Sequence, residues 1–125
     1  MDVKEKVNRY SKQSLHYLNN AFRFLEQGDV GKSSEFLWGS FAEALKALAS
    51  SKGITINKHW EIGDFVKELT KELKDKSIYD TYLHANALHK NFYEIEIDLD
   101  DIRRIAEDVR RTVGKLLNLI PSIEI

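Results

Sequence analysis

Residues 36–49 read Phe-Leu-Trp-Gly-Ser-Phe-Ala-Glu-Ala-Leu-Lys-Ala-Leu-Ala, and this stretch decides the fold class. Its apolar residues cover an arc too wide for a helix that keeps one side in water. The small residues among them permit close approach of a neighbouring helix. We expect a central helix here, capped by Asp29 or Ser33 and ended by Gly53.

Helices are also expected on both sides of this stretch. The first runs from near Asp2 to Gln27, because apolar residues recur three and four apart, and Gly28 supplies a left-handed stop. After a short loop, Asn57 is expected to cap a helix in which Gly63 indicates a tight crossing, since glycine costs ~1 kcal/mol relative to alanine. The residues expected to be buried there are Ile62, Phe65, Val66, Leu69 and Leu73.

Two more helices complete the prediction. Asp75 or Ser77 starts one of them, and Asp98 or Asp100 caps the other after an extended connection. The tail 121–125 is expected to fray, because Pro121 cannot continue a helix. Short connections and the lack of an alternating strand pattern predict an all-α fold, an antiparallel up-and-down bundle of four to five helices.

Length and composition limit the functional classes. Residues 1–125 suffice for one domain with a single core. The net charge of −1 gives no global field to attract nucleic acid or an anionic membrane. The lack of cysteine excludes disulfides, thiol catalysis and a Cys-based zinc site. No apolar signal core or membrane-length apolar run occurs, so we expect a cytoplasmic protein with no membrane association.

The stretch richest in chemical groups is 82–94, Tyr-Leu-His-Ala-Asn-Ala-Leu-His-Lys-Asn-Phe-Tyr-Glu. It begins as the fourth expected helix, and its last residues lead into the extended connection. His84 and His89 are five residues apart, so on a straight helix they point about 140° away from each other. A shared metal ion needs a spacing of three or four. We therefore expect neither a metal nor a cofactor.

His89 is the candidate catalytic residue. Asn86 and Tyr93 lie one turn to either side, and Lys90 and Asn91 are adjacent. Such a cluster is able to hold a phosphate while a neutral imidazole moves a proton. The alternative, which the spacing alone favours, is that His89 is a hydrogen-bonded histidine at a helix interface.

Other candidates have structural interpretations. His59, beside Trp60, is expected to cap, stack or pack under the preceding loop, and His16 carries no motif. Four arginines recur along the last helix, but Glu107 lies one turn from several of them, so a salt-bridged surface is expected. These arginines are Arg103, Arg104, Arg110 and Arg111.

The order of several short motifs resembles the HEPN superfamily of helical bundles, and most of all its archaeal PaREP1-type branch. The motifs are Ala44-Leu-Lys-Ala-Leu-Ala49 with Gly53 after it, His59 at the next helix start, and 87–94, and the likeness spans roughly residues 10–115. It implies an up-and-down bundle, frequent homodimerisation and association with RNA or nucleotides. Some relatives are metal-independent endoribonucleases, and others are toxins paired with a nucleotidyltransferase.

The resemblance also implies where a site would lie. Active HEPN ribonucleases carry an arginine, usually followed by a polar residue, and then a histidine roughly four to six residues after the arginine. His89 matches the histidine, but His84 stands at the arginine position and Ala85 at the polar one. A neutral imidazole does not replace a permanently charged guanidinium. The resulting candidates are His89 for proton transfer, and His84, Lys90, Asn91 and Tyr93 for binding.

Two classes of function follow from these features. The first is an HEPN-like protein associated with RNA or nucleotides, including a weak or degenerate metal-independent ribonuclease. The second is a non-catalytic dimeric helical module that acts through a protein partner, for example of the nucleotidyltransferase type. A homodimer is expected in both cases, because aromatic residues exceed what a five-helix monomer readily covers. These are Phe24, Trp38, Trp60, Phe92 and Tyr93.

Overall fold

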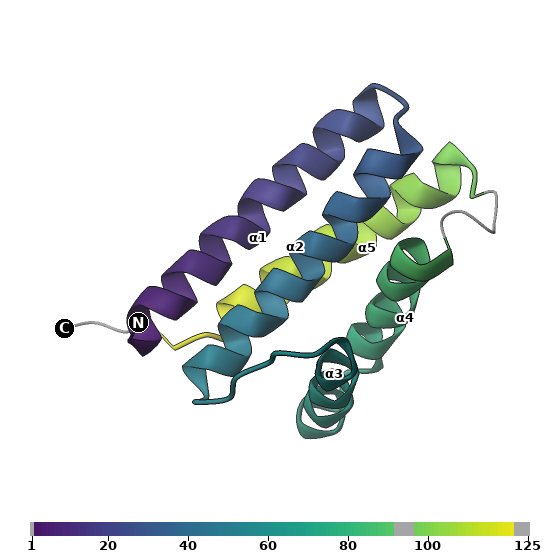
Figure 1. Ribbon diagram of the computed structural model, residues 1–125. Helices are drawn as coiled ribbons and strands as arrows, with labels where there is room; N and C mark the ends of the chain where they lie inside the picture. Colours follow the sequence, from purple (N-terminus) through teal and green to yellow (C-terminus); the bar gives the residue numbers. More distant parts are fainter. Residues whose placement is uncertain (1, 92–96, 122–125) are drawn as a thin grey trace.

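The computed structural model describes residues 2–91 and 97–121, which form five helices and no strand. In Figure 1, α1, α2, α4 and α5 alternate in direction, while the shorter α3 is seen nearly end-on beside α4. The predicted all-helical bundle is confirmed. The helices are α1 (Val3–Glu26), α2 (Val30–Ser51), α3 (His59–Leu73), α4 (Lys76–Asn91) and α5 (Leu99–Asn118).

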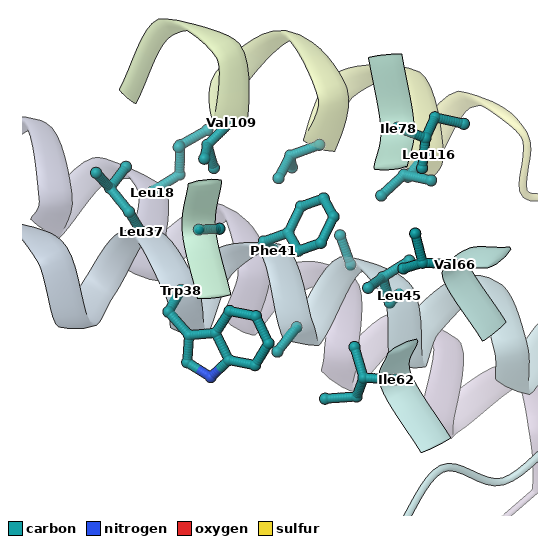
Figure 2. Close-up of a cluster of buried hydrophobic side chains, with 14 of the residues drawn as sticks. Leu18, Leu37, Trp38, Phe41, Leu45, Ile62, Val66, Ile78, Val109 and Leu116 are labelled. Carbon is teal, nitrogen blue, oxygen red and sulfur yellow. The ribbon is translucent and has the colours of Figure 1, made fainter. Parts of the chain in front are cut away.

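Helix α2 is the centre of the bundle, as its wide apolar arc predicts. It packs against each of the other four helices. Leu37, Phe41 and Leu45 are fully buried, and Figure 2 shows Phe41 and Leu45 between side chains of α5 and α3. Burial of each such side chain stabilises the fold by roughly 1.5–3 kcal/mol.

Most helix ends lie where their capping residues predict. The carboxylates of Asp29 and Asp98 cap α2 and α5, and Gly28 and Gly53 have φ angles of +72° and +77° beyond the ends of α1 and α2. The Asp75 carboxylate accepts a hydrogen bond from the Ser77 backbone N–H at 3.0 Å, where α4 begins. Glycine avoids the strain that other residues incur at these two left-handed positions.

The predicted cap of α3 is wrong. Lys58, not Asn57, is the N-cap residue, and its side chain makes no cap hydrogen bond. Instead the Glu61 carboxylate, three residues later, accepts hydrogen bonds from the backbone N–H groups of Lys58 at 2.9 Å and Asn57 at 3.4 Å. A carboxylate in the first turn also interacts favourably with the positive end of the helix dipole.

Leu73 was expected in the core but is 37% exposed. It is the last residue of α3, and the chain turns away at Lys74, which has a φ angle of +53°. The predictions for residues 92–96 and 122–125 lie outside the described residues. They comprise most of the extended connection and the frayed tail.

Small residues create two close helix contacts. Between α1 and α2, the Ser14 hydroxyl donates to the Ser40 carbonyl at 2.7 Å, and the Ser40 hydroxyl donates to the Ser14 carbonyl at 2.9 Å. Between α3 and α4, a Cβ atom added to Gly63 would lie 2.9 Å from the Tyr82 hydroxyl. The tight crossing predicted at Gly63 is therefore confirmed.

Polar side chains in the contact between α4 and α5 are paired with one another. The hydroxyls of Thr81 and Thr112, both buried, are 3.0 Å apart. One turn further, Lys115 forms an ion pair of 2.5 Å with Asp75, which lowers the pKa of this carboxyl from 3.8 to about 2. We call the side of α4 that carries Ser77, Thr81 and His84 its α5 flank.

Candidate functional site

His89 lies on the opposite side of α4, against α2. Its ring stacks on the Trp38 indole with 5.2 Å between centroids and 19° between planes. Its side chain is 38% exposed, whereas Trp38 is only 8% exposed. The ring is therefore neither enclosed in the core nor free on the surface.

A carboxylate lies at the edge of this ring. Glu35 Oε2 is 3.9 Å from His89 Nδ1, a distance that allows electrostatic attraction to an imidazolium but not a hydrogen bond. Nδ1 itself is buried and has no hydrogen-bond partner among the described residues. This buried nitrogen without a described partner differs from the hydrogen-bonded histidine that the spacing alone favoured.

His59, the first residue of α3, is the second imidazole of the site. Its Nε2 donates a hydrogen bond to Asn86 Oδ1 on α4 at 2.9 Å. Its ring lies 5.0 Å from the Trp38 ring and 5.7 Å from the His89 ring. Of the three roles left open for His59, the structure shows stacking, and its ring partners are a histidine of the candidate site and a core tryptophan.

The three ring separations exclude a linear stack of the three rings. If three parallel rings were stacked in series, the outer two would be at least ~7 Å apart, since stacked rings are separated by ~3.5 Å. All three separations are 5.0–5.7 Å with tilts of 30° or less. The three rings are therefore clustered and not stacked in series, with the His89 ring stacked on both the Trp38 indole and the His59 ring. We name His59, His89 and Asn86, supported by Trp38, the imidazole face.

A tyrosine extends the aromatic floor of this site. The ring of Tyr82 is 6.3 Å from that of Trp38 and 6.4 Å from that of Phe41. Burial raises the pKa of the Tyr82 phenol above its usual value. The phenol consequently stays neutral near pH 7 and supplies no charge to the site.

His84 is separated from His89, as the five-residue spacing predicts. It is exposed on the α5 flank, where it lines a shallow pocket of about 260 Å³ with Thr81, Asp108 and Arg111. Arg111 pairs with Asp108 at 2.7 Å and Lys115, which also lines this pocket, pairs with Asp75, so both cations are already neutralised. The structure therefore does not bring the two histidine candidates together in one site.

The remaining candidates lie at the end of α4. Lys90 and Asn91 belong to its last turn, but their side chains fall outside the described part of the chain. Tyr93 lies within residues 92–96 and is also outside it. No structural role is assigned to these three side chains.

Only part of the expected aromatic surface is exposed. Trp38 is a core residue and Phe24 stacks on Phe36 at 5.6 Å, so neither offers the free ring that the dimer prediction assumed. Figure 2 shows Trp38 at the edge of the buried cluster, turned away from Val109. Trp60, at 62% exposed, remains as a free indole, while Phe92 lies outside the described residues.

Among the described residues, three of the four arginines in the basic line on α5 are salt-bridged, of which Arg111 pairs with Asp108. Arg110 pairs with Glu107, and Arg103 pairs with Asp100 at 3.5 Å. Within residues 2–91 and 97–121, no three His, Asp or Glu side chains are grouped to hold a metal ion. In the same ranges, no helix combines the length and apolar character needed to cross a membrane.

Sequence reasoning missed two members of this site. Glu35 and Trp38 are three residues apart on α2 and so share a side of the helix, which is a signal that the sequence contains. The hydrogen bond between His59 and Asn86 joins residues 27 apart in the chain. Only the packing of α3 on α4 reveals it.

The protein is a small helical bundle with two partly exposed histidines on one side. A model of the archaeal PaREP1/PaREP8 family matches residues 9–113. The chain belongs to this family. The matched residues include parts of all five helices and end within α5. No curated protein matches the chain.

Proposed function

We propose that this protein binds RNA or a nucleotide through its imidazole face. The observation that carries the proposal is the pair of partly exposed imidazoles, His59 and His89, held on a buried indole with His89 Nδ1 free of a described hydrogen bond. Aromatic and imidazole rings are common stacking partners of unpaired bases. The resemblance to HEPN proteins supports the same ligand class, since many of those bundles associate with RNA or nucleotides.

Catalysis is the weaker form of this proposal. In this form His89 exchanges a proton with a bound ligand, and a metal-independent ribonuclease activity follows. The position of the HEPN arginine is occupied by His84, which lies on the α5 flank. Without a permanent cation from that position, the developing charge on phosphorus is poorly stabilised, and we expect cleavage to be slow or absent.

Binding and cleavage are tested together. Purified protein is incubated with single- and double-stranded RNA in EDTA, beside His89→Ala and the control His16→Ala, which removes an exposed histidine on α1. We expect the parent and the control to retain RNA by filter binding, and His89→Ala to lose at least ~10-fold in affinity. Unchanged RNA affinity in a folded His89→Ala variant would refute the proposal.

A second function is favoured by one observation. The free indole of Trp60 and the 45% exposed side chain of Leu83 lie on α3 and α4, which pack together. Exposed apolar side chains of this size suit a protein contact, so a dimeric interaction module is the alternative. Light scattering of the parent and of Trp60→Ala at tens of micromolar tests it, since a contact through Trp60 predicts a dimer that the variant loses.

A further inference from the structure

The imidazole face differs from a phosphate site in the charges around it. Glu35 places a carboxylate 3.9 Å from His89 Nδ1. A phosphate beside that nitrogen would be repelled by this carboxylate, because like charges at such distances oppose one another. The Lys32 ammonium, a cation on the same helix, contacts the Phe24 ring instead, 5.1 Å from the ring centre.

The shape of the face suits a flat ligand instead. The His89 ring stacks on the His59 ring, at 18° between planes, and on the Trp38 indole, at 19°. Since Trp38 is buried and His89 is 38% exposed, the accessible ring surface belongs to the imidazoles. A planar heterocycle stacks on such a surface whatever its charge.

Asn86 gives this surface a polar edge. Its Oδ1 accepts the hydrogen bond from His59, and its amide N–H groups donate no hydrogen bond to a described residue. An amide group has two such donors. These donors are suited to the carbonyl oxygens or ring nitrogens at the edge of a nucleobase.

From these three features we infer that the imidazole face takes an unpaired nucleobase, stacked on the partly exposed His89 ring and hydrogen-bonded by Asn86, with the phosphates left in solvent. The inference rests on the proposed RNA or nucleotide function and specifies the part of the ligand that is recognised. Single strands are then preferred over duplexes, because paired bases do not expose a free face. Affinity also depends little on salt, since few counterions are released.

The test distinguishes recognition of the base from recognition of the phosphate. Adenosine and ribose 5-phosphate are titrated into the protein while the imidazole proton resonances of His59 and His89 are followed by NMR. We expect adenosine to shift both sets of resonances and ribose 5-phosphate to shift neither. The reverse result would overturn the inference.

Salt dependence supplies an independent measurement. Each phosphate contact of a single strand lowers affinity by about 2.6-fold between 50 and 200 mM salt, since the slope is ~0.7 per contact. We expect an unpaired oligoadenylate to lose less than about 3-fold over this range and to bind more tightly than a matched hairpin. A loss of more than about 20-fold, or tighter binding of the hairpin, would contradict base recognition.

Variants distinguish stacking from proton transfer. His89→Ala is expected to weaken adenosine binding by at least ~10-fold, whereas His89→Phe, which keeps a flat ring, stays within ~3-fold of the parent. Equal loss in both folded variants would overturn the stacking role. If RNA binds but adenosine does not, only this inference fails, and if no RNA binds at all, the proposed function fails with it.

Discussion

The polar groups on the two flanks of α4 differ in whether they have partners within the bundle. On the α5 flank, Thr81 pairs with Thr112, and Asp75 at the helix start pairs with Lys115. On the flank that faces α2 and α3, His89 keeps a ring nitrogen without a described partner. Buried polar groups without partners destabilise a fold, so they persist mainly where a function uses them. This difference supports the candidate site on the imidazole face over the pocket beside His84, although Ser34 Oγ and Thr70 Oγ1 also lack a described partner.

The largest effect is expected at the floor of the imidazole face. Trp38→Ala should lower the free energy of unfolding by ~3–5 kcal/mol, because it removes a core side chain and the support of both imidazoles. Urea denaturation followed by circular dichroism measures this change. The matched control is Trp60→Ala, whose exposed indole should change stability by less than ~0.5 kcal/mol. Similar losses in both variants would show that Trp38 is not the floor of this face.

The second largest effect on stability is expected on the α5 flank. Thr81→Val or Thr112→Val alone should cost ~1–2 kcal/mol, because each leaves the other buried hydroxyl without its partner. The double variant should cost less than the sum of the two single losses, as expected for a coupled pair. Urea unfolding of all four proteins gives the coupling energy. Additive losses would mean that the hydroxyl pair does not stabilise the α4–α5 contact.

Acid should weaken the ion pair at the start of α4. The folded-state pKa of Asp75, about 2, is below the ordinary value of 3.8. The stabilisation is therefore present above pH ~4 and is lost as the pH falls from 3.8 through about 2. Lys115→Gln should cost about 1 kcal/mol at pH 6, after allowance for solvent screening, and almost nothing near pH 2. A difference that does not change with pH would exclude the ion pair as its source.

The smallest effect is expected at His84. Its exposed side chain makes no hydrogen bond with a described residue, so His84→Ala should change unfolding free energy by less than ~0.5 kcal/mol and leave RNA affinity within ~2-fold of the parent. Parallel RNA titration of His89→Ala shows whether the two flanks differ. A larger loss of RNA binding in His84→Ala than in His89→Ala would move the site to the α5 flank.

The periodicity of apolar residues was sufficient to predict the helices, because burial of one side of a helix is a local pattern. Asp29, Asp98 and the two left-handed glycines mark ends that the structure confirms. Sequence reasoning failed at Asn57, where the Glu61 side chain does the capping from the next turn. It also placed Trp38 on the surface, since helix spacing does not show which neighbour covers a large ring.

The candidate site was predicted only in part. His89 could be chosen from its neighbours on α4, and its separation from His84 followed from their spacing. The approach of His59 to His89 requires α3 to pack beside α4, and no local pattern encodes that contact. The proximity of Glu35 likewise depends on how α4 lies against α2. Long-range packing therefore determines the chemistry of this site more than any single motif does.

The crossed hydrogen bonds between Ser14 and Ser40 have a consequence for how α1 and α2 can move. Each hydroxyl binds the carbonyl of the opposite residue, so a slide of one helix by a turn, about 5.4 Å, breaks both bonds at once inside a buried contact. Gradual slippage is thereby opposed, and the two helices have one preferred register. Local opening of the bundle then begins more easily at α3 and α4 than within this hairpin, whose central amides should be among the slowest to exchange with solvent.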